Sequence, residues 1–418
     1  MTQLLTSTGA APGIPPTPRI LVVVNVYRPD LGGGVLFADL CQGLKARGWD
    51  VTVRCAYPYY PEWKDKSGQN GWKIRHEDDD GVRVERFGLY IPSDPNSFLQ
   101  RLLYEASFFL SLMRRPIRRG AFDAILVFCP LVGAVAYAGW GARRSRTPLW
   151  LNLQDLSAQA AAAGGIAQNT SLLEHVQNAL FRGAGCWSSI SQPMIEALKA
   201  IPGAPEDVHF VPNWMHGSLA THLRGARPRS PIPDERPVRL LYSGNIGGKQ
   251  NLLAFCTWLA ASDHDFEFRI QGAGGRAEEI RSWINQAQDA RFSMGDLTDE
   301  AGLAAKLAWA DAYVITEQPG AGSSFVPSKL IPGMTSAAPI LAVCDPDGPL
   351  GQEVLQHGVG FVASWEHSDA LATFFHIARH HPDQYTGWST AAAKRGAFYD
   401  RDQAIDRYVD ILQRLTTN

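Results

Sequence analysis

Several features that mark other protein classes are missing from this 418-residue sequence. No apolar run reaches the ~18–20 residues that a membrane-spanning helix needs. The first nineteen residues are rich in Ser, Thr, Gly and Pro and lack the apolar core of a signal peptide. The net charge of -2 at pH 7 argues against a general nucleic-acid binder, because such proteins carry an excess of Lys and Arg. We therefore expect no membrane span and no nucleic-acid partner.

Cysteine pairs are also missing. The six cysteines include no CxxC pair, so the sequence predicts neither a zinc site nor a disulfide framework. Nearly all lie in apolar runs, where buried free thiols are expected, and a reducing, cytoplasmic compartment fits. Three consecutive aspartates precede Gly81. A hairpin turn at Gly81 is our interpretation, and a metal-binding cluster is the alternative.

No loop has the full GxGxxG fingerprint, which argues against an NAD-dependent dehydrogenase. Glycine loops do follow several apolar strands, and the most informative lies in residues 238–251. There an apolar run leads to Gly244, Gly247, Gly248 and Lys249, and a second apolar run with helical character follows. A helix N-terminus behind such a loop is a phosphate site, to which Lys249 would add positive charge. The alternative is a strand-to-helix turn with a surface lysine.

Two further candidates lie in the N-terminal half. Gly33 and Gly34 precede a predicted helix and would let a ligand approach the backbone, although a flexible turn is the alternative. Asp155 follows the predicted strand 149–153. A carboxylate at the carboxyl end of a strand is a candidate base or hydroxyl anchor, and a helix cap is the alternative.

The C-terminal half offers two more loops. Gly274 belongs to a Gly-Ala-Gly-Gly turn after the strand 266–271, which is also compatible with an ordinary strand-to-helix turn. Pro327 is expected to open a helix whose first turn holds Ser328 and Lys329. A lysine and a hydroxyl in that position suit a diphosphate, and an ordinary helix start is the alternative.

The length predicts two domains, because single cores stop growing near 250–300 residues. Both halves alternate apolar strands with helices, so we expect an α/β protein of two doubly wound, Rossmann-like domains facing across a cleft. The expected divisions are a disordered lead-in (1–19), an N-terminal domain (20–223), a Pro/Arg-rich linker (224–237), a C-terminal domain (238–390) and a final helix that can pack back on the first domain (391–418).

Residues 98–119 combine an apolar helical pattern with arginines at 101, 114, 115, 118 and 119. An apolar helix with a basic end can lie on an anionic membrane surface. The alternative is a core helix whose basic end is solvated.

Taken in order, these motifs resemble the family 4 glycosyltransferases of the GT-B fold. The loop ending in Gly34 resembles that family's Pro…Gly-Gly loop, and residues 211–215 resemble its interdomain motif. The more specific segments are similar to those of the colanic-acid-type, WcaI-like exopolysaccharide transferases. These segments are Tyr57-Pro-Tyr-Tyr-Pro-Glu-Trp63, Gln154-Asp155-Leu156, Gly244-Asn-Ile-Gly247 and Pro327-Ser-Lys-Leu330. The likeness covers about residues 20–415.

The resemblance implies a retaining transfer of a sugar from a UDP- or GDP-sugar, without a required metal or cofactor. The acceptor is expected to be a lipid-linked oligosaccharide at the cytoplasmic face of the membrane. By position, Lys249 and Lys329 would neutralise the diphosphate, and Asp155 would contact a sugar hydroxyl or the acceptor. The residues expected around the donor are Gly33, Gly34, Gly244, Asn245, Gly274 and Ser328, with Glu353 toward the ribose and Glu317 as a further sugar contact.

Three departures from the family pattern stand out. Its pair of glutamates matches Ser324 and Pro332 here, Asn245 stands where an arginine is usual, and Gln154 replaces a frequent histidine. These changes keep two alternatives open. One is a pseudo-transferase that binds nucleotide-sugar and recruits partners, and the other is a nucleotide-sugar epimerase on the same scaffold.

Overall fold

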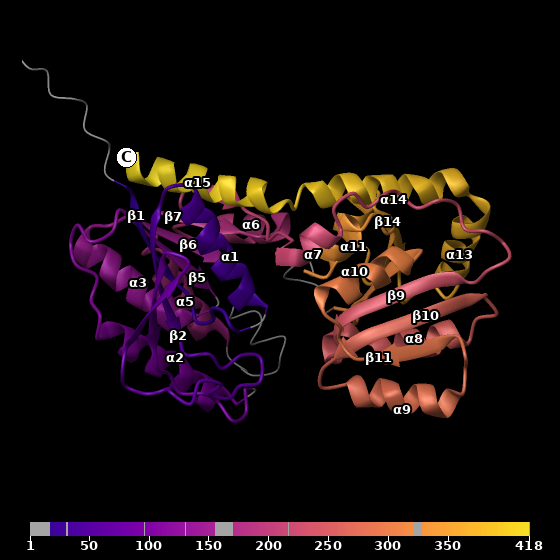
Figure 1. Ribbon diagram of the computed structural model, residues 1–418, viewed down its shortest axis with the longest axis horizontal. Coiled ribbons are helices and arrows are strands. Elements are labelled where there is room, and N and C mark those ends of the chain that lie inside the picture. The colour runs from indigo at the N-terminus through magenta and orange to yellow at the C-terminus, as the bar shows by residue number, and fades with distance from the viewer. Residues whose placement is uncertain are drawn as a thin grey trace, which may run out of the picture.

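The computed structural model describes residues 17–30, 32–95, 97–129, 131–154, 170–215, 217–320 and 328–417. Two α/β domains lie side by side in it, each built on its own sheet (Figure 1). The two final helices lie end to end along one side of both domains (Figure 1). The expectation of an α/β protein with two doubly wound domains is therefore confirmed.

The first sheet has the order β3-β4-β2-β1-β5-β6-β7-β8. Neighbouring strands are parallel except β3 and β4, which form the hairpin expected at Gly81. Asp80 and Gly81 turn this hairpin with φ of 53° and 84°. The strands are β1 (Arg19–Val23), β2 (Asp50–Ala56), β3 (Arg75–Asp79), β4 (Val82–Phe87), β5 (Ala124–Cys129), β6 (Leu149–Leu153), β7 (Cys186–Ser189) and β8 (Val208–Phe210).

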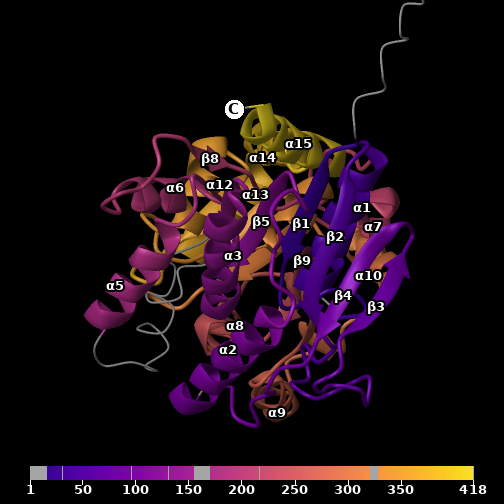
Figure 2. The same ribbon diagram turned by 90° about the vertical axis from the view of Figure 1, so that its left-hand side faces the viewer.

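Helices cover both faces of this sheet (Figure 2). From β1 the chain passes through α1 to β2 on one side of the sheet centre. It then returns through α2 to β5 on the other side and continues outward through α3 and α5. Because such crossovers are right-handed, α1 covers one face of the sheet, and α2, α3 and α5 cover the other. This leaves α2, α3 and α5 together on one side of the first domain. The helices are α1 (Gly33–Ala46), α2 (Phe98–Met113), α3 (Val132–Ser145), α5 (Thr170–Phe181) and α6 (Gln192–Lys199).

The second sheet has the order β11-β10-β9-β12-β13-β14, and all its neighbouring strands are parallel. Its strands are β9 (Val238–Asn245), β10 (Phe266–Ala273), β11 (Phe292–Gly295), β12 (Ala312–Thr316), β13 (Ile340–Val343) and β14 (Gly360–Ala363). Its helices are α7 (Gly217–His222), η1 (Gly248–Gln250), α8 (Leu252–Ala260), α9 (Ala277–Ala287), α10 (Glu300–Trp309), α11 (Leu330–Thr335), α12 (Pro349–His357), α13 (Ala370–His380) and α14 (Pro382–Ala397).

The last helix, α15 (Arg401–Thr417), packs on the first domain rather than on the second. Ile405, Tyr408 and Leu412 are buried in the core of the first domain. The Asn152 side chain donates to the Tyr408 hydroxyl over 3.1 Å, and the Tyr408 ring packs on Trp150. The polypeptide therefore joins the two domains twice, once before α7 and once between α14 and α15.

The segment 224–237 differs from its expected role as a linker. Arg229 donates to the carbonyls of Leu307 and Ala310 at the end of α10, over 2.6 and 2.9 Å. Leu219 and Leu223 already pack in the core of the second domain. The chain thus crosses between domains near residues 211–215. The Pro/Arg-rich composition resembles a linker, but here the guanidinium satisfies carbonyls that a helix end leaves without partners.

The structure also bears on the cysteines, on membrane-spanning helices and on metal-binding clusters. All six cysteines are buried free thiols, as expected. Over the described part of the chain, no helix is long and apolar enough to cross a bilayer. The same residues contain no cluster of three or more His, Cys, Asp or Glu side chains suited to a metal ion.

Candidate functional site

The glycine loop after β9 is shaped by a lysine from a distant segment. Gly244 has a φ of 125°, and a Cβ added there would lie 2.7 Å from the Lys329 Cε. Only glycine lets the Lys329 side chain cross this backbone without strain. Gly274, at the end of β10, has a φ of 145°, and its Cβ would lie 2.5 Å from the Ile246 carbonyl oxygen. The two glycine loops therefore pack directly against each other.

The Lys329 ammonium is held at this loop by two oxygens. It donates to the Asn245 carbonyl over 2.9 Å and to the Tyr242 hydroxyl over 2.6 Å, and it lies 4.3 Å from the centre of the Tyr242 ring. Burial lowers the pKa of Lys329 to about 8, against an opposing effect of Glu317. An anion bound here would raise that pKa again, because it favours the charged form.

The helix expected to begin at Pro327 begins instead at Leu330. Ser328 and Lys329 therefore precede the helix rather than lie in its first turn, a difference within the usual scatter of helix ends. Pro332 lies in the first turn, where its missing N–H costs nothing. Because α11 has only six residues, the cation at this position is the lysine itself rather than a helix dipole. Pro327 and Ser324 lie outside the described residues.

Glu317 brings a carboxyl group to the same place. It follows β12, and burial raises its pKa to about 7, with Asp345 adding to the rise and Lys249 and Lys329 opposing it. The Glu317 backbone is fixed on both sides: its N–H donates to Val343 over 2.9 Å, and its carbonyl accepts from the Trp365 indole over 2.7 Å. The fold thus brings together Lys249, Glu317 and Lys329 from three separate loops.

Lys249 lies in η1, and its backbone carbonyl accepts from the Gln318 N–H over 2.8 Å. The Gly247 N–H is also engaged, because it donates to the Gln250 side chain over 2.9 Å. This bonding fixes the loop between β9 and α8 against the loop after β12. Lys249 is consequently positioned at the carboxyl edge of the second sheet.

Glu353, expected near the ribose, is engaged by protein groups. Its carboxylate accepts from the Arg395 guanidinium over 2.7 Å and from the Tyr399 hydroxyl over 3.1 Å. It borders a cavity of about 560 Å³ that Ser191 and Phe210 of the first domain also line. Its ribose contact stays a prediction, because the bonds that it makes join α12 to the end of α14 within the second domain.

The first domain also contributes a glycine loop. Gly33 and Gly34 begin α1 rather than precede it, and a Cβ at Gly34 would lie 3.0 Å from the Asp30 Cβ. The buried Asp30 carboxylate accepts from the backbone N–H groups of Tyr59 and Tyr60 over 3.3 and 3.1 Å. The glycine loop after β1 is thereby tied to the loop after β2.

Sequence reasoning missed a polar and aromatic cluster at this edge. The Asn25 side chain donates to the hydroxyls of Tyr59 and Tyr104 over 2.9 Å each. Trp63 packs edge-on against both tyrosine rings. Tyr59 and Trp63 belong to a segment that the resemblance did single out. Their partner Tyr104 lies on α2. The sequence of this helix is mostly apolar, so its few polar residues were not considered as site residues.

Glu105, the next residue of α2, was also missed. Its carboxylate accepts from the Gly133 N–H at the start of α3 over 2.9 Å. Burial raises its pKa to about 7, and Arg101 opposes this only partly. The first domain therefore also holds a carboxyl group that titrates near neutral pH. No short motif marks it in the sequence, because the contact depends on the packing of α2 against α3.

Asp155 lies outside the described residues, so its role stays a prediction. Its neighbour Gln154 donates to the Asn152 side chain over 2.6 Å and accepts from Asn213 over 2.8 Å. Gln154 thus joins the end of β6 to the interdomain crossing.

Comparisons with known proteins agree with this architecture. Residues 32–214 match the family model described as a glycosyl transferase 4-like domain. The chain carries a glycosyl transferase 4-like domain. A relative from Escherichia coli (strain K12), named as a colanic acid biosynthesis glycosyl transferase, WcaI, is 29% identical over 75% of this chain and 80% of its own.

Solved structures extend the likeness to the whole fold. Sucrose-phosphate synthase from Thermosynechococcus elongatus matches with a TM-score of 0.67 at 15% identity, covering 96% of this chain and 99% of that one. Anabaena HepE in complex with UDP matches with a TM-score of 0.66 at 14% identity, covering 95% and 100%. The GT-B fold expected from the motifs is confirmed. The match to the family model and the likeness to the WcaI relative support a glycosyltransferase.

Proposed function

We propose that the chain is a retaining glycosyltransferase that moves a sugar from a UDP- or GDP-sugar to a lipid-linked oligosaccharide, without a metal cofactor, in exopolysaccharide synthesis. The observation that carries this proposal is the convergence of Lys249, Glu317 and Lys329 beside two packed glycine loops. This group combines cations with bare backbone at the carboxyl edge of a parallel sheet, where ligands of such folds bind.

The chemical need is to stabilise a leaving group. When the bond between the sugar and the diphosphate breaks, its electron pair passes to the diphosphate oxygen, and negative charge builds there. We assign the balancing of that charge to Lys249 and Lys329. In a retaining transfer the acceptor oxygen forms its bond on the face that the diphosphate leaves. The departing phosphate oxygens are then near enough to take the acceptor proton.

The depressed pKa of Lys329 supports a site that is tuned for an anion. A buried ammonium near its pKa gains its full charge when a diphosphate binds. A charge-assisted hydrogen bond of this kind contributes ~1.5–3 kcal/mol. Glu317 interacts electrostatically with both lysines, and its carboxylate limits the net positive charge of the loop when it is ionised.

The first domain offers a surface of different character for the acceptor. Trp63 is half-buried, Arg101 lies over its ring at 5.7 Å, and Glu105 lies one turn farther along α2. Sugar sites commonly combine an aromatic wall with a few fixed polar groups. We assign the acceptor sugar to this edge, with Asp155 as a further proposed contact.

Residues 98–119 support the membrane part of the proposal. Leu99, Leu102 and Leu110 of α2 are 64%, 54% and 60% exposed, which is unusual for leucines on a folded domain. Arg118 and Arg119 follow the helix and are exposed. An apolar helix with a basic end suits an anionic bilayer surface, and a lipid-linked acceptor would be presented there.

The first experiment is calorimetry with UDP and GDP on the wild type and on Lys329→Met. The proposal expects one of the two nucleotides to bind and Lys329→Met to weaken that binding at least tenfold. Lys394→Met, an exposed lysine of α14, is the matched control and should change nothing. Equal binding by all three proteins would place the donor elsewhere.

Turnover then separates the proposal from its alternatives. The wild type is incubated with nucleotide-sugars, with and without a lipid extract, and the products are analysed by mass spectrometry. Sugar transferred to a lipid, with its anomeric configuration kept, supports the proposal. An altered free sugar without any acceptor would favour an epimerase. Nucleotide binding with no turnover across the panel would favour a pseudo-transferase.

A further inference from the structure

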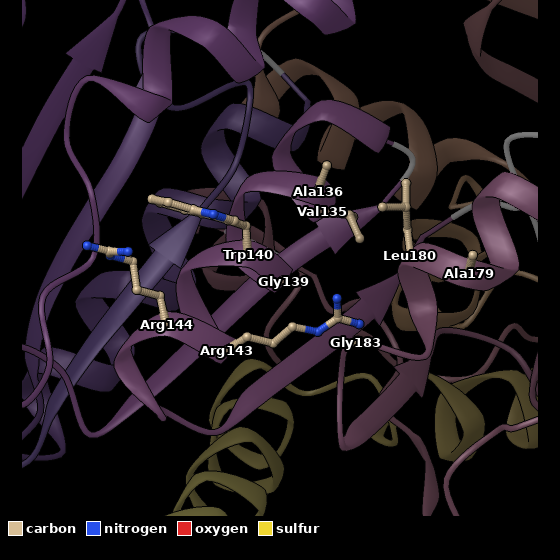
Figure 3. A pocket seen from close by; sticks show the side chains of 9 residues that line it. All are labelled: Val135, Ala136, Gly139, Trp140, Arg143, Arg144, Ala179, Leu180 and Gly183. Atoms are coloured by element: carbon tan, nitrogen blue, oxygen red, sulfur yellow. The ribbon is translucent and has the colours of Figure 1, made fainter.

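A surface cavity on the first domain is separate from the glycine loops. It lies between α3 and the end of α5 and has a volume of about 440 Å³ (Figure 3). Both helices run from the carboxyl edge of the sheet toward the amino edge, and the cavity lies along most of α3, from Val135 to Arg144. Its lining residues are Val135, Ala136, Gly139, Trp140, Arg143, Arg144, Ala179, Leu180 and Gly183.

The cavity combines positive charge with an apolar floor. Two arginines line it, and none of the described residues that line it carries a carboxylate. Arg143 extends toward Gly183, whereas Trp140 and Arg144 lie on the other side of Gly139 (Figure 3). The Arg144 guanidinium lies 5.8 Å from the centre of the Trp140 ring, and that indole is 37% exposed. The floor between the guanidinium groups is glycine and aliphatic carbon.

The surroundings of the cavity are apolar and basic as well. Val176 of α5 is 48% exposed. The helix α2, which carries the exposed leucines, lies on the same side of the sheet as α5 (Figure 2). Ile117 packs on Gly141, since a Cβ there would lie 2.5 Å from the Ile117 side chain. This contact brings the arginines at 118 and 119 to the end of α3 that holds Arg143 and Arg144. The whole chain has a net charge of only -2, so these four arginines are not part of a general excess of positive charge.

We propose that this cavity binds the phosphate headgroup of an anionic membrane phospholipid. The two guanidinium groups would pair with the phosphate from either side of Gly139, since planar guanidinium groups suit phosphate geometry. The apolar floor and the indole would contact the glycerol and upper acyl carbons, as indoles do at the bilayer interface. A soluble phosphate compound would have no use for the exposed leucines and valine around the site, which favours a bilayer lipid as the occupant.

This inference rests on the membrane part of the proposed function and names the lipid that would hold the first domain there. It is independent of the sugar donor, because the cavity and the lysine loops share no residue. Failure of the lipid site would leave nucleotide binding intact, and failure of the donor site would leave lipid binding intact. Calorimetry with UDP or GDP on each variant below separates the two.

The first test is co-sedimentation of the full chain with vesicles at low salt. Vesicles of phosphatidylcholine with phosphatidylglycerol should bind the wild type, and pure phosphatidylcholine vesicles should bind it far less. The double variant Arg143→Gln, Arg144→Gln should lose about twenty- to thirtyfold in affinity, since each basic residue near an anionic surface contributes about fivefold. Arg224→Gln, Arg227→Gln removes the same charge from exposed positions of the second domain and should stay within about twofold.

A steric variant tests the cavity itself while keeping its charges. Gly139 lies in the floor, and a Cβ added there meets no atom within 4 Å, so Gly139→Leu should fill the space without strain. It should lower binding to the anionic vesicles at least fivefold, whereas a purely general charge attraction would be unaffected. Gly387→Leu on α14, where a Cβ also meets nothing within 4 Å, is the control and should bind as the wild type does.

Thermal melting of every variant confirms that it folds. Competition by glycerol phosphate distinguishes a bilayer lipid from a free phosphate compound, and the proposal expects no displacement at concentrations that leave the vesicles intact. Wild-type binding by Gly139→Leu, or equal losses in the two double-arginine variants, would overturn the cavity as a lipid site. Displacement by glycerol phosphate with no preference for anionic vesicles would overturn the membrane lipid as its occupant.

Discussion

The carboxyl edges of the two sheets each hold a buried glutamate, but the groups around the two glutamates differ. Each edge holds one glutamate whose pKa burial raises to about 7: Glu105 in the first domain and Glu317 in the second. Glu317 has Lys249 and Lys329 as neighbours and two glycine loops beside it. Glu105 accepts from the Gly133 N–H, and its chain neighbour Tyr104 contacts Asn25 and Trp63.

Under the proposed function, this difference assigns the donor to the edge of the second domain and the acceptor to the edge of the first. A diphosphate needs cations and close backbone, which the second domain supplies through Lys329 and Gly244. A neutral sugar needs hydrogen-bond partners fixed against an aromatic wall, which the first domain supplies through Tyr104 and Trp63. Each of the predictions below changes a residue at one edge. The measurements test whether the properties of the other edge stay unchanged.

The largest effect is expected from Gly274→Ala in the second domain. Its φ of 145° and the 2.5 Å approach of the new Cβ to the Ile246 carbonyl oppose any side chain. The variant should lose about 3 kcal/mol or more of unfolding free energy. Gly275→Ala, whose Cβ would meet nothing within 4 Å, is the neighbouring control. Urea unfolding measures both, and equal stability of the two variants would mean that the glycine loops do not pack as described.

The next effect concerns the cation of the same edge. Lys329→Met should weaken binding of the preferred nucleoside diphosphate by about 1.5–3 kcal/mol. Lys329→Arg should recover only part of the loss, because the guanidinium is wider than the gap over Gly244. Isothermal calorimetry decides this. Full affinity in Lys329→Met would assign the diphosphate to other groups.

A pH-dependent effect is expected at the first edge. The pKa of Glu105 is about 7 in the folded chain against 4.5 ordinarily. Its favourable contribution is therefore complete below about pH 4.5 and lost as the pH rises through about 7. Glu105→Gln removes this titration, so its unfolding free energy relative to the wild type should rise by about 1–3 kcal/mol between about pH 5 and pH 8.

Glu278→Gln on the exposed start of α9 controls for the loss of charge and should show a flat difference. Glu105→Gln should also leave nucleoside diphosphate affinity unchanged while it alters acceptor use. If the stability difference between Glu105→Gln and the wild type does not change with pH, the raised pKa of Glu105 is contradicted. If Glu105→Gln loses nucleotide binding, the two edges do not act separately.

Parts of this arrangement follow from local sequence and parts do not. The strands, the glycine loops and Lys249 lie in short patterns, because a strand, a turn and a helix start depend on neighbouring residues. The bond from Lys329 to the Asn245 carbonyl joins positions 84 residues apart. This bond requires that β9 pairs with β12, and no local sequence pattern predicts that pairing.

The errors have the same origin. Arg229 lies in a segment that resembles a linker, yet its partners are helix carbonyls about 80 residues away. Glu105 lies on α2, which was interpreted only as an apolar helix with a basic end. The packing of α3 against α2 brings the Gly133 N–H to the Glu105 carboxylate. Where the structure draws on contacts between distant segments, composition and periodicity carry no information about the partner.

The central claim is that Lys329 is a poised cation that becomes fully charged when a diphosphate binds. Calorimetry in buffers of different ionisation enthalpy measures the protons taken up on binding, at about pH 8.5, above the pKa of about 8. The wild type should take up more than half a proton per bound nucleotide, and Lys329→Met should take up close to none. Equal uptake by the two proteins would contradict the claim.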